Sequence, residues 1–571
     1  MQPKRQMLTG DLPSTIMLFT VFVTFVIAMN YSGEQIGGYG LELLFNNSVW
    51  IAYVLIVLLG VCLIIKKAKV RLSNGFVYLV LFSIPLFIPS LFSFSDLRYE
   101  SILIYGAIIA AFLLIFVIEQ FKNKNFTRRL LFILLCSSII QTVFGLYQYY
   151  FIFDSSFLFP HAETHAKPYG IFLQINVFST YLAFGSLLSI YFLFSAKKQT
   201  KALIIFTFVL VILNAHLSML AETKTGRVVP LIALAIYLGY FSWKRHHKTW
   251  LLTSLLFLFA ALVSFTPKQW FDVRPSQVVE APIGIQSLGM RPLMYKVGIE
   301  IVIDNPVSGI GMGELPREFN FRKAELLSSK QDLKRMTAIA NHIHNEPLQW
   351  MIELGVFSLV SFVGIFGVWV VGLFKGWYDI SILLLALPFI GHTMLELPFY
   401  NSAPHLLAFA TILALANKKT LKLVHFPSSI GWGVVPILSA ISFKVIAFFI
   451  LSISSNKILK EYRMTGERNE NLLYAVEPTI GFERFFTHEK FQWELKRAVK
   501  KGAIDQALVF NYIVFLENIR MQWPEAIIYI QLAEMYLISG QNQKALEIME
   551  EGYLFFPLDE KVTELYKQLK G

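Results

Sequence analysis

The sequence predicts an all-α polytopic membrane protein of about thirteen transmembrane helices, with a large outer loop and a C-terminal helical domain on the same side. Hydrophobic residues make up 55% of the 571 residues and charged residues only 15%, and the mean hydropathy is +0.57. A soluble protein of this length would need more charge to cover its surface. Apolar runs recur along the chain, and basic residues gather between them, as in a protein that crosses the membrane many times.

Thirteen apolar runs are candidates for crossing a hydrocarbon core of about 30 Å, which takes about 20 residues. They lie near residues 14–30, 48–65, 75–95, 101–121, 129–150, 169–195, 201–220, 227–243, 249–265, 347–374, 379–397, 403–417 and 429–453. The first run follows Lys4 and Arg5, as in a signal peptide, but no small-residue cleavage site comes after it. We therefore interpret it as a membrane helix.

Lysine and arginine residues are expected in the cytoplasmic connections. One set of connections holds most of them: Lys4, Arg5, Lys66, Lys67, Lys69, Arg71, Lys122, Lys124, Arg128, Arg129, Lys197, Lys198, Lys201, Lys244, Arg245, Lys248, Lys375, Lys418, Lys419 and Lys422. The short loops of the other set hold little more than Arg98, Lys167, Lys224 and Arg227. This alternation predicts a cytoplasmic N-terminus and an external C-terminus, in agreement with an odd number of spans.

Two hydrophilic regions face outward in this topology, a loop at 267–345 and a tail at 455–571. We therefore divide the chain into a transmembrane domain, 1–454, and a C-terminal helical domain, 455–571. Residues 526–558 fit one tetratricopeptide-like repeat, with Ala533, Tyr536, Ala545 and Pro557 at the expected positions but Gly552 in place of a usual alanine. An ordinary helical hairpin fits about as well, because a single repeat cannot bury its own face.

Several classes of function are disfavoured. The net charge of +12 reflects the loop lysines and arginines rather than a nucleic-acid surface. Both cysteines, Cys62 and Cys136, fall inside apolar runs, so a disulfide framework or thiolate metal site is not expected. The sequence contains no phosphate-binding glycine loop, which disfavours ATP-driven chemistry, and no serine nucleophile elbow.

The segment Asn341–Leu348 joins the outer loop to the tenth span and contains His344. Asn345 is a plausible N-cap and Pro347 is tolerated in the first turn, so His344 should lie just before a helix. The positive end of that helix disfavours an imidazolium, and we expect a neutral His344 that can accept a proton. Alternatively, His344 is only a polar cap at the membrane surface.

Two arginines lie in outer connections, Arg227 at the start of the eighth span and Arg291 in the long loop. If they converge, their forked donors would suit a diphosphate. From the residues alone, contact with lipid headgroups or pairing with Glu222 and Glu280 is the more common outcome.

Lys167 opens the sixth span on the same side, and Gln174 and Asn176 follow it. Polar residues in the outer turns of a membrane helix usually line a cavity, although Gln174 could equally bond a neighbouring helix.

Four histidines raise the possibility of a metal: His161, His165, His342 and His344. Two histidines four residues apart form a ligand pair only on a helix, and the stretch 160–168 is expected to be a loop, so we expect no metal site. His392 and Glu396 are also four residues apart, within the eleventh span, and we expect them to make internal hydrogen bonds that hold helices together.

The segment after His344 resembles the signature of the O-antigen ligase and polymerase superfamily: a histidine, a small polar residue, nine residues, glycine, two residues and glycine. His344 and Asn345 are followed by nine residues through Leu354 and then Gly355, while Ser358 replaces the last glycine. Three further elements look like those of the family and occur in its order, at Lys167–Gly170 with Gln174–Asn176, at Thr225–Arg227, and at Arg291 through Gly309–Gly313. Lysine and isoleucine stand where the first element usually has arginine and proline.

Within this superfamily the chain most resembles the bacterial O-linked protein oligosaccharyltransferases, which glycosylate pilins and other periplasmic proteins. The resemblance implies an inner-membrane enzyme that needs no metal, nucleotide or other cofactor. It would transfer a glycan from a polyprenyl diphosphate to a hydroxyl with inversion. His344 would be the general base, and Arg227 and Arg291 would stabilise the diphosphate. Lys167, Gln174, Asn176 and Asn345 would help to bind the donor.

Two other functions stay open. An O-antigen ligase or polymerase is the enzymatic alternative, although lipid A-core ligases usually end soon after their last membrane helix, whereas this chain continues for more than a hundred residues. A non-catalytic transporter of lipid-linked glycans is the alternative of another class. We detect no inverted repeat, and the candidate residues gather at one face rather than at the midplane, which favours an enzyme.

Overall fold

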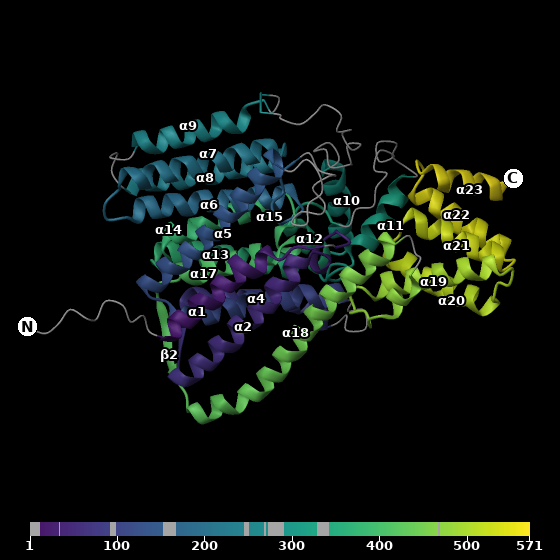
Figure 1. Cartoon of the computed structure of the whole chain (residues 1–571), viewed down its shortest axis with the longest axis horizontal. Coiled ribbons are helices and arrows are strands. Elements are labelled where there is room, and N and C mark those ends of the chain that lie inside the picture. Colours follow the sequence, from purple (N-terminus) through teal and green to yellow (C-terminus); the bar gives the residue numbers. More distant parts are fainter. Residues whose placement is uncertain are drawn as a thin grey trace, which may run out of the picture. The chain divides into compact units, whose positions relative to one another are not determined.

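The structure is a computed structural model that describes residues 12–33, 35–91, 99–151, 167–244, 250–267, 270–271, 291–327, 342–465 and 469–571. Within these residues the chain is helical apart from one pair of short strands, in agreement with the predicted membrane fold (Figure 1). It divides into two compact units. The first comprises Met1–Leu81, Gly106–Val278 and Ile365–Lys460, and the second comprises Phe82–Tyr105, Val279–Gly364 and Glu461–Gly571.

The first unit contains most of the long apolar helices. They are α1 (Leu12–Phe22, continued by irregular turns to Asn30), α2 (Leu44–Lys67), α3 (Asn74–Ser83), α4 (Tyr99–Phe121), α5 (Lys124–Tyr150), α6 (Ile175–Ser195), α7 (Lys201–Leu220), α8 (Lys224–Lys244), α9 (Trp250–Phe265), α13 (Val356–Phe374), α14 (Ile380–Leu383), α15 (Leu387–Thr393), α16 (Pro398–Asn401), α17 (Ala403–Ala416) and α18 (Ser428–Met464). Helices α3, α4, α13 and α18 continue into the second unit.

The second unit contains the helices of the outer loop and of the tail. They are α10 (Arg291–Asp304), α11 (Leu315–Leu327), α12 (Glu346–Leu354), α19 (Glu483–Lys500), α20 (Gln506–Gln522), α21 (Ala526–Ile538), α22 (Asn542–Phe555) and α23 (Glu560–Lys570). Helices α21 and α22 occupy the region predicted as a tetratricopeptide-like repeat, and its assignment to that repeat class stays a prediction.

Nine of the described helices are long and apolar enough to cross a membrane, and they coincide with nine of the predicted runs. Shorter apolar helices, Asn74–Phe87, Trp250–Phe265, Ile380–Thr393 and Ala403–Ala416, occupy the other four. The chain is therefore a multi-pass membrane protein, and the count of thirteen spans stays a prediction.

Helix α6 forms the centre of the first unit and is buried along most of its length. Helices α6 to α9 lie side by side in Figure 1. Buried polar groups join α5, α6 and α7: the Asn214 amide accepts a hydrogen bond from Thr142 at 2.8 Å and donates one to the Leu182 carbonyl at 3.0 Å. Such bonds between membrane helices satisfy polar groups that lipid cannot.

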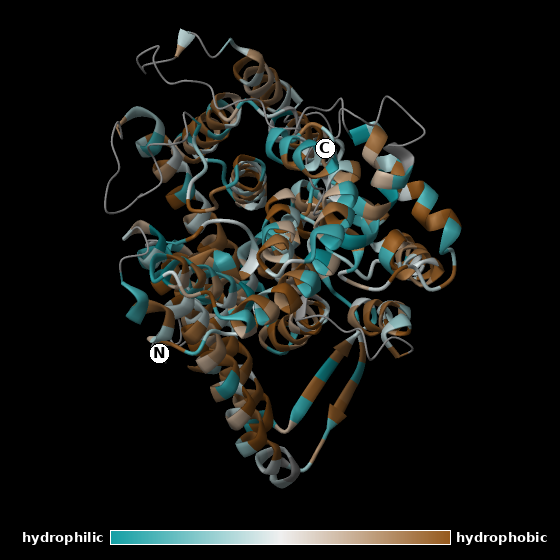
Figure 2. Ribbon diagram, turned by 90° about the vertical axis from the view of Figure 1, so that its right-hand side faces the viewer, coloured by the Kyte–Doolittle hydropathy of each residue, from teal (hydrophilic) through white to brown (hydrophobic). Residues whose placement is uncertain are grey.

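The two strands differ from the all-α fold that the sequence predicts, and they lie in two of the connections between apolar runs. Strands β1 (Lys69–Ser73) and β2 (Thr420–His425) pair antiparallel, with Lys69 opposite His425 and a register shift between Leu72 and Ser73. Both strands mix hydrophilic and hydrophobic residues, as the ribbon in Figure 2 shows. Alternating charged and apolar residues suit a strand, but we had interpreted the charges only as topology signals.

Candidate active site

His344 immediately precedes the N-cap of α12, as predicted. The Asn345 side chain accepts a hydrogen bond from the Leu348 N–H at 2.9 Å, and Pro347 lies in the first turn. His344 itself has a left-handed backbone with φ of +54°. A non-glycine residue in this region is costly and persists only where its surroundings hold it, which is common at functional sites.

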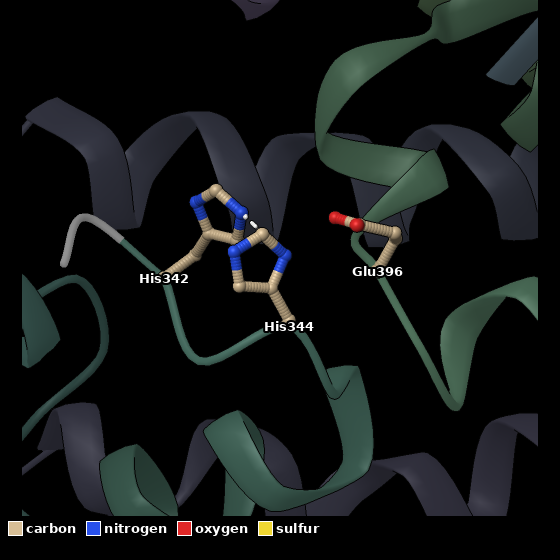
Figure 3. A group of neighbouring side chains, drawn as sticks. All are labelled: His342, His344 and Glu396. Carbon is tan, nitrogen blue, oxygen red and sulfur yellow. Dashed lines mark hydrogen bonds between the residues drawn. The ribbon is translucent and has the colours of Figure 1, made fainter. Parts of the chain in front are cut away.

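His342 is a hydrogen-bond partner of His344, and the sequence analysis had considered it only as a possible metal ligand. His342 Nε2 and His344 Nδ1 are 3.2 Å apart, and the ring centroids are separated by 4.1 Å (Figure 3). If His344 Nδ1–H donates to His342, His344 Nε2 carries the lone pair that a general base needs. The pair therefore can select the reactive nitrogen of His344.

The glycine-rich run after α10 supports the other end of α12. The Ile310 and Gly311 N–H groups donate to the Ile352 and Glu353 carbonyls at 3.0 and 2.9 Å. Gly355 has φ of +56°, and a Cβ placed on it would lie 2.4 Å from the Val307 carbonyl oxygen. This close backbone approach requires glycine.

The predicted span 347–374 is therefore wrong as one helix. It is divided into α12 and α13 at Gly355, and only Val356–Phe374 qualifies as a candidate span. Beneath His344, α12 packs on α10 and α11 through a small core that includes Val297, Phe319 and Ile352. His344 is thus attached to a packed scaffold of the outer loop.

Arg291 is the first residue of α10, and only 9% of it is exposed. The unpaired N–H groups and the dipole of a helix N-terminus favour an anion, and a guanidinium at the same place adds to that preference. The position is thus suited to a phosphate group. Glu280, which we considered as its alternative partner, lies outside the described residues.

Arg227 lies in the first turn of α8. Its Nη2 donates to the Met219 carbonyl at 2.8 Å, while its Nε is buried and has no hydrogen-bond partner among the described residues. Gly226 permits this turn, since a Cβ there would lie 2.3 Å from Thr223 Oγ1 and 2.8 Å from Ser179 Oγ of α6. An anionic acceptor at Arg227 Nε would satisfy a donor that the described chain leaves unpaired.

Lys167 forms an ion pair with Glu222, with Nζ and Oε2 3.2 Å apart and both side chains partly exposed. The sequence analysis had considered Glu222 as a partner for an arginine. The Lys167–Glu222 pair places Lys167 beside the connection that leads into α8.

Gln174 and Asn176 differ from the expected arrangement because α6 begins at Ile175, not near residue 169. Gln174 is the N-cap residue and makes no capping bond through its side chain. The Asn176 side-chain Nδ2 donates to Glu396 Oε1 at 3.4 Å, and its Oδ1 is buried with no hydrogen-bond partner among the described residues.

Gln148 and Gln141 of α5 hold the loop before α6 in place. The Gln148 side chain accepts from the Gly170 N–H at 2.8 Å and donates to the Gly170 carbonyl at 2.8 Å. Gln141 accepts from the Ile171 N–H at 3.0 Å. These bonds replace helical ones, which explains why the helix starts late. The sequence analysis missed both glutamines, although two glutamines seven residues apart in an apolar run were a usable signal.

His392 and Glu396 make the internal hydrogen bonds that we predicted. His392 Nδ1 lies 2.7 Å from Thr180 Oγ1, and Glu396 accepts from Asn176, so both join α6. Asn176 and Thr180 are one helical turn apart on α6. The Asn176–Glu396 and Thr180–His392 hydrogen bonds therefore join α6 to the α15 segment at two successive turns. Glu396, which is also drawn in Figure 3, thus holds the Asn176 side-chain amide.

The candidate residues are distributed over both units. Lys167, Gln174, Asn176 and Arg227 belong to the first unit, and Arg291, His344 and Asn345 to the second. Convergence of Arg227 with Arg291 and His344 therefore stays a prediction, as do the roles of all seven residues and the expectation of no metal. His161 and His165 lie outside the described residues.

Two protein families match the chain. Residues 217–363 match the family described as O-antigen ligase, and residues 380–570 match the family described as virulence factor membrane-bound polymerase, C-terminal. The first match contains Arg227, Arg291, His344 and Asn345. No curated protein matches the chain.

Proposed function

We propose that the chain is a member of the O-antigen ligase/polymerase superfamily, whose models match residues 217–363 and 380–570, and that it transfers a whole oligosaccharide from a polyprenyl diphosphate to serine or threonine hydroxyls of periplasmic proteins such as pilins. The two family matches support glycosyl transfer of the ligase or polymerase kind at a membrane. The protein acceptor, the bacterial inner-membrane location, the cytoplasmic N-terminus and the external C-terminal domain are parts of the proposal.

In the proposed reaction, His344 Nε2 takes the proton of the acceptor hydroxyl. The hydroxyl oxygen forms a bond to the anomeric carbon as the bond from that carbon to the diphosphate breaks, with inversion. The negative charge that grows on the diphosphate oxygen is stabilised by Arg227 and Arg291. No metal takes part in this mechanism.

The His342–His344 hydrogen bond is the observation that carries the proposal, because it can hold His344 in the tautomer that accepts a proton at Nε2. The first-turn positions of both arginines add a second argument. Helix N-termini favour anions, and the buried Arg227 Nε has no acceptor among the described residues. Lys167, Gln174, Asn176 and Asn345 would complete the donor site.

The test is co-expression of the chain with a pilin-type acceptor and a lipid-linked glycan pathway, followed by intact mass of the acceptor. We expect added glycan mass with the wild type and a loss of at least about 100-fold with His344→Ala at equal membrane abundance. His425→Ala, which changes an exposed histidine on β2, should leave the added mass intact. Retained glycan transfer in His344→Ala would contradict the assignment of the base.

A second candidate function, polymerisation of glycan chains, is favoured by the family match over residues 380–570. The same cells distinguish the two functions when the lengths of the lipid-linked glycans are compared as well. If His344→Ala shortens those glycans and leaves the acceptor mass unchanged, polymerisation is the better assignment. A point variant is preferable to deletion of the tail, since Phe321 and Ala324 of α11 pack against the tail helices.

A further inference from the structure

Helix α18 touches α2 near both ends of α2. Gly431 lies against Ile65, and the Phe449 ring stacks on Trp50 with a centroid distance of 6.2 Å. Further along α18, Asn456 donates to the Glu42 carbonyl, just before α2, at 2.6 Å. The two helices therefore run antiparallel beside each other (Figure 1).

Between these contacts, α18 lacks the burial that packing would produce. No residue from Trp432 through Phe448 is buried. The side of α18 that bears Lys444 faces away from the residues that touch α2, and Ile437, Ile441 and Leu451 on this side are 62%, 53% and 42% exposed. We call this side of the helix, defined by Ile437, Ile441, Lys444 and Leu451, the α18 surface.

Lys444 lies at the centre of this surface and is exposed. It follows Ser429 by 15 residues and precedes Lys457 by 13, which at 1.5 Å per residue is about 22 Å and about 20 Å. In a hydrocarbon core of about 30 Å, this places the Lys444 backbone near the middle of the bilayer. Lys444 makes no ion pair or hydrogen bond with any residue that the structure describes.

A lysine at this depth is unfavourable in lipid, and intramembrane charges usually face a partner or a water-filled cavity. We propose that the α18 surface binds one transmembrane helix of a partner protein, and that an aspartate or glutamate near the centre of that helix pairs with Lys444. Ile437, Ile441 and Leu451 would pack on the rest of the partner helix.

Charge complementarity decides between the possible occupants. A second copy that used the same surface would bring a second Lys444 to the first, and like charges repel. The diphosphate of a lipid carrier lies at headgroup level, about half a bilayer away from Lys444. A carboxylate on a spanning helix can reach this depth. A membrane-anchored acceptor protein would be such a partner, and this last step alone rests on the proposed function.

The test uses the full-length chain and a single-span probe helix of leucine and alanine with one central glutamate, each with its own affinity tag. The matched probe has glutamine in place of the glutamate. We expect at least tenfold more glutamate probe than glutamine probe to co-purify with the wild type. Lys444→Leu should remove this preference without lowering membrane abundance, and Lys444→Glu should transfer it to a probe with a central lysine. Lys457→Leu, a lysine change near the end of α18, should leave it unchanged.

Equal recovery of the two probes, or a preference that survives Lys444→Leu, would overturn the proposal. Lys444-dependent co-purification of two differently tagged copies of the chain, without the probe, would also overturn it by showing self-association. The readout is independent of glycosyl transfer. If His344→Ala and the wild type both fail to glycosylate while the probe still binds, the proposed function is wrong and the partner surface stands.

Discussion

Replacing Lys323 with methionine should stabilise the packing of the outer loop against the tail. Lys323 lies on α11, outside the candidate spans, and none of its surface is exposed. Its neighbour Ala324 is in the core of the tail helices, and the Phe321 ring meets Phe555 edge-on at 5.0 Å. Removal from water lowers the pKa of the Lys323 ammonium from its ordinary 10.5 to about 8.

The pKa difference sets the size of the effect. One unit of pKa shift corresponds to about 1.36 kcal/mol. The fall of the Lys323 pKa from 10.5 to about 8 therefore corresponds to a free-energy cost of about 3 kcal/mol for burying the charged form. Below pH 8, Lys323 is charged in both the folded and unfolded states, and the folded state bears the full cost. Between about pH 8 and 10.5 only the unfolded state keeps the proton, so the wild type gains stability as the pH rises through this window.

Lys323→Met should therefore raise the free energy of unfolding by up to about 3 kcal/mol at pH 7, and this advantage should narrow to about 1 kcal/mol at pH 9.5. Urea-dependent proteolysis of the purified chain in detergent measures the difference for the helices outside the membrane. Lys561→Met, on the exposed side of α23, is the matched control and should change stability by less than about 0.5 kcal/mol. A Lys323→Met variant that is no more stable at pH 7, or an advantage independent of pH, would refute this reasoning.

Two further predictions concern the loops that support the candidate site. Gly355→Ala should lower the stability of the second unit by about 1–3 kcal/mol, because the backbone is left-handed and an added Cβ would lie 2.4 Å from the Val307 carbonyl oxygen. Thermal unfolding measures this loss. Gly367→Ala, where an added Cβ meets no atom within 4 Å, should show no such loss. Gln148→Leu should leave the buried Gly170 N–H without its acceptor, at a cost of about 1–3 kcal/mol. Hydrogen exchange of the Gly170 amide should then accelerate about tenfold or more, and unchanged exchange would contradict the buttressing role of Gln148.

Local signals accounted for much of the fold. Each membrane helix is defined by a continuous apolar run, because lipid forces such a segment to satisfy its backbone hydrogen bonds internally. The start of α12 was likewise predictable, since Asn345 and Pro347 act on the first turn of their own helix. The internal hydrogen bonds of His392 and Glu396 followed from two polar residues on one helical face.

The errors occurred where distant residues decide the backbone. The span 347–374 breaks at Gly355 because Val307 and Gly309 approach it, and α6 starts at Ile175 because Gln141 and Gln148 supply the hydrogen bonds of the preceding loop. The β1–β2 pair joins segments about 350 residues apart. Hydropathy of one segment contains no information about these partners.

The sequence by itself determined that this protein is a helical membrane protein and identified His344, Arg227 and Arg291 as candidates, because hydropathy, caps and motifs are local properties. Only the tertiary structure decided which groups become neighbours: it places the His342 ring beside His344 and Gln148 against the Gly170 loop, and it buries Lys323. It also showed that Lys444 lies on an uncovered surface. Proton transfer, burial of charge and docking all depend on neighbours in space, and a chain acquires those neighbours only by folding.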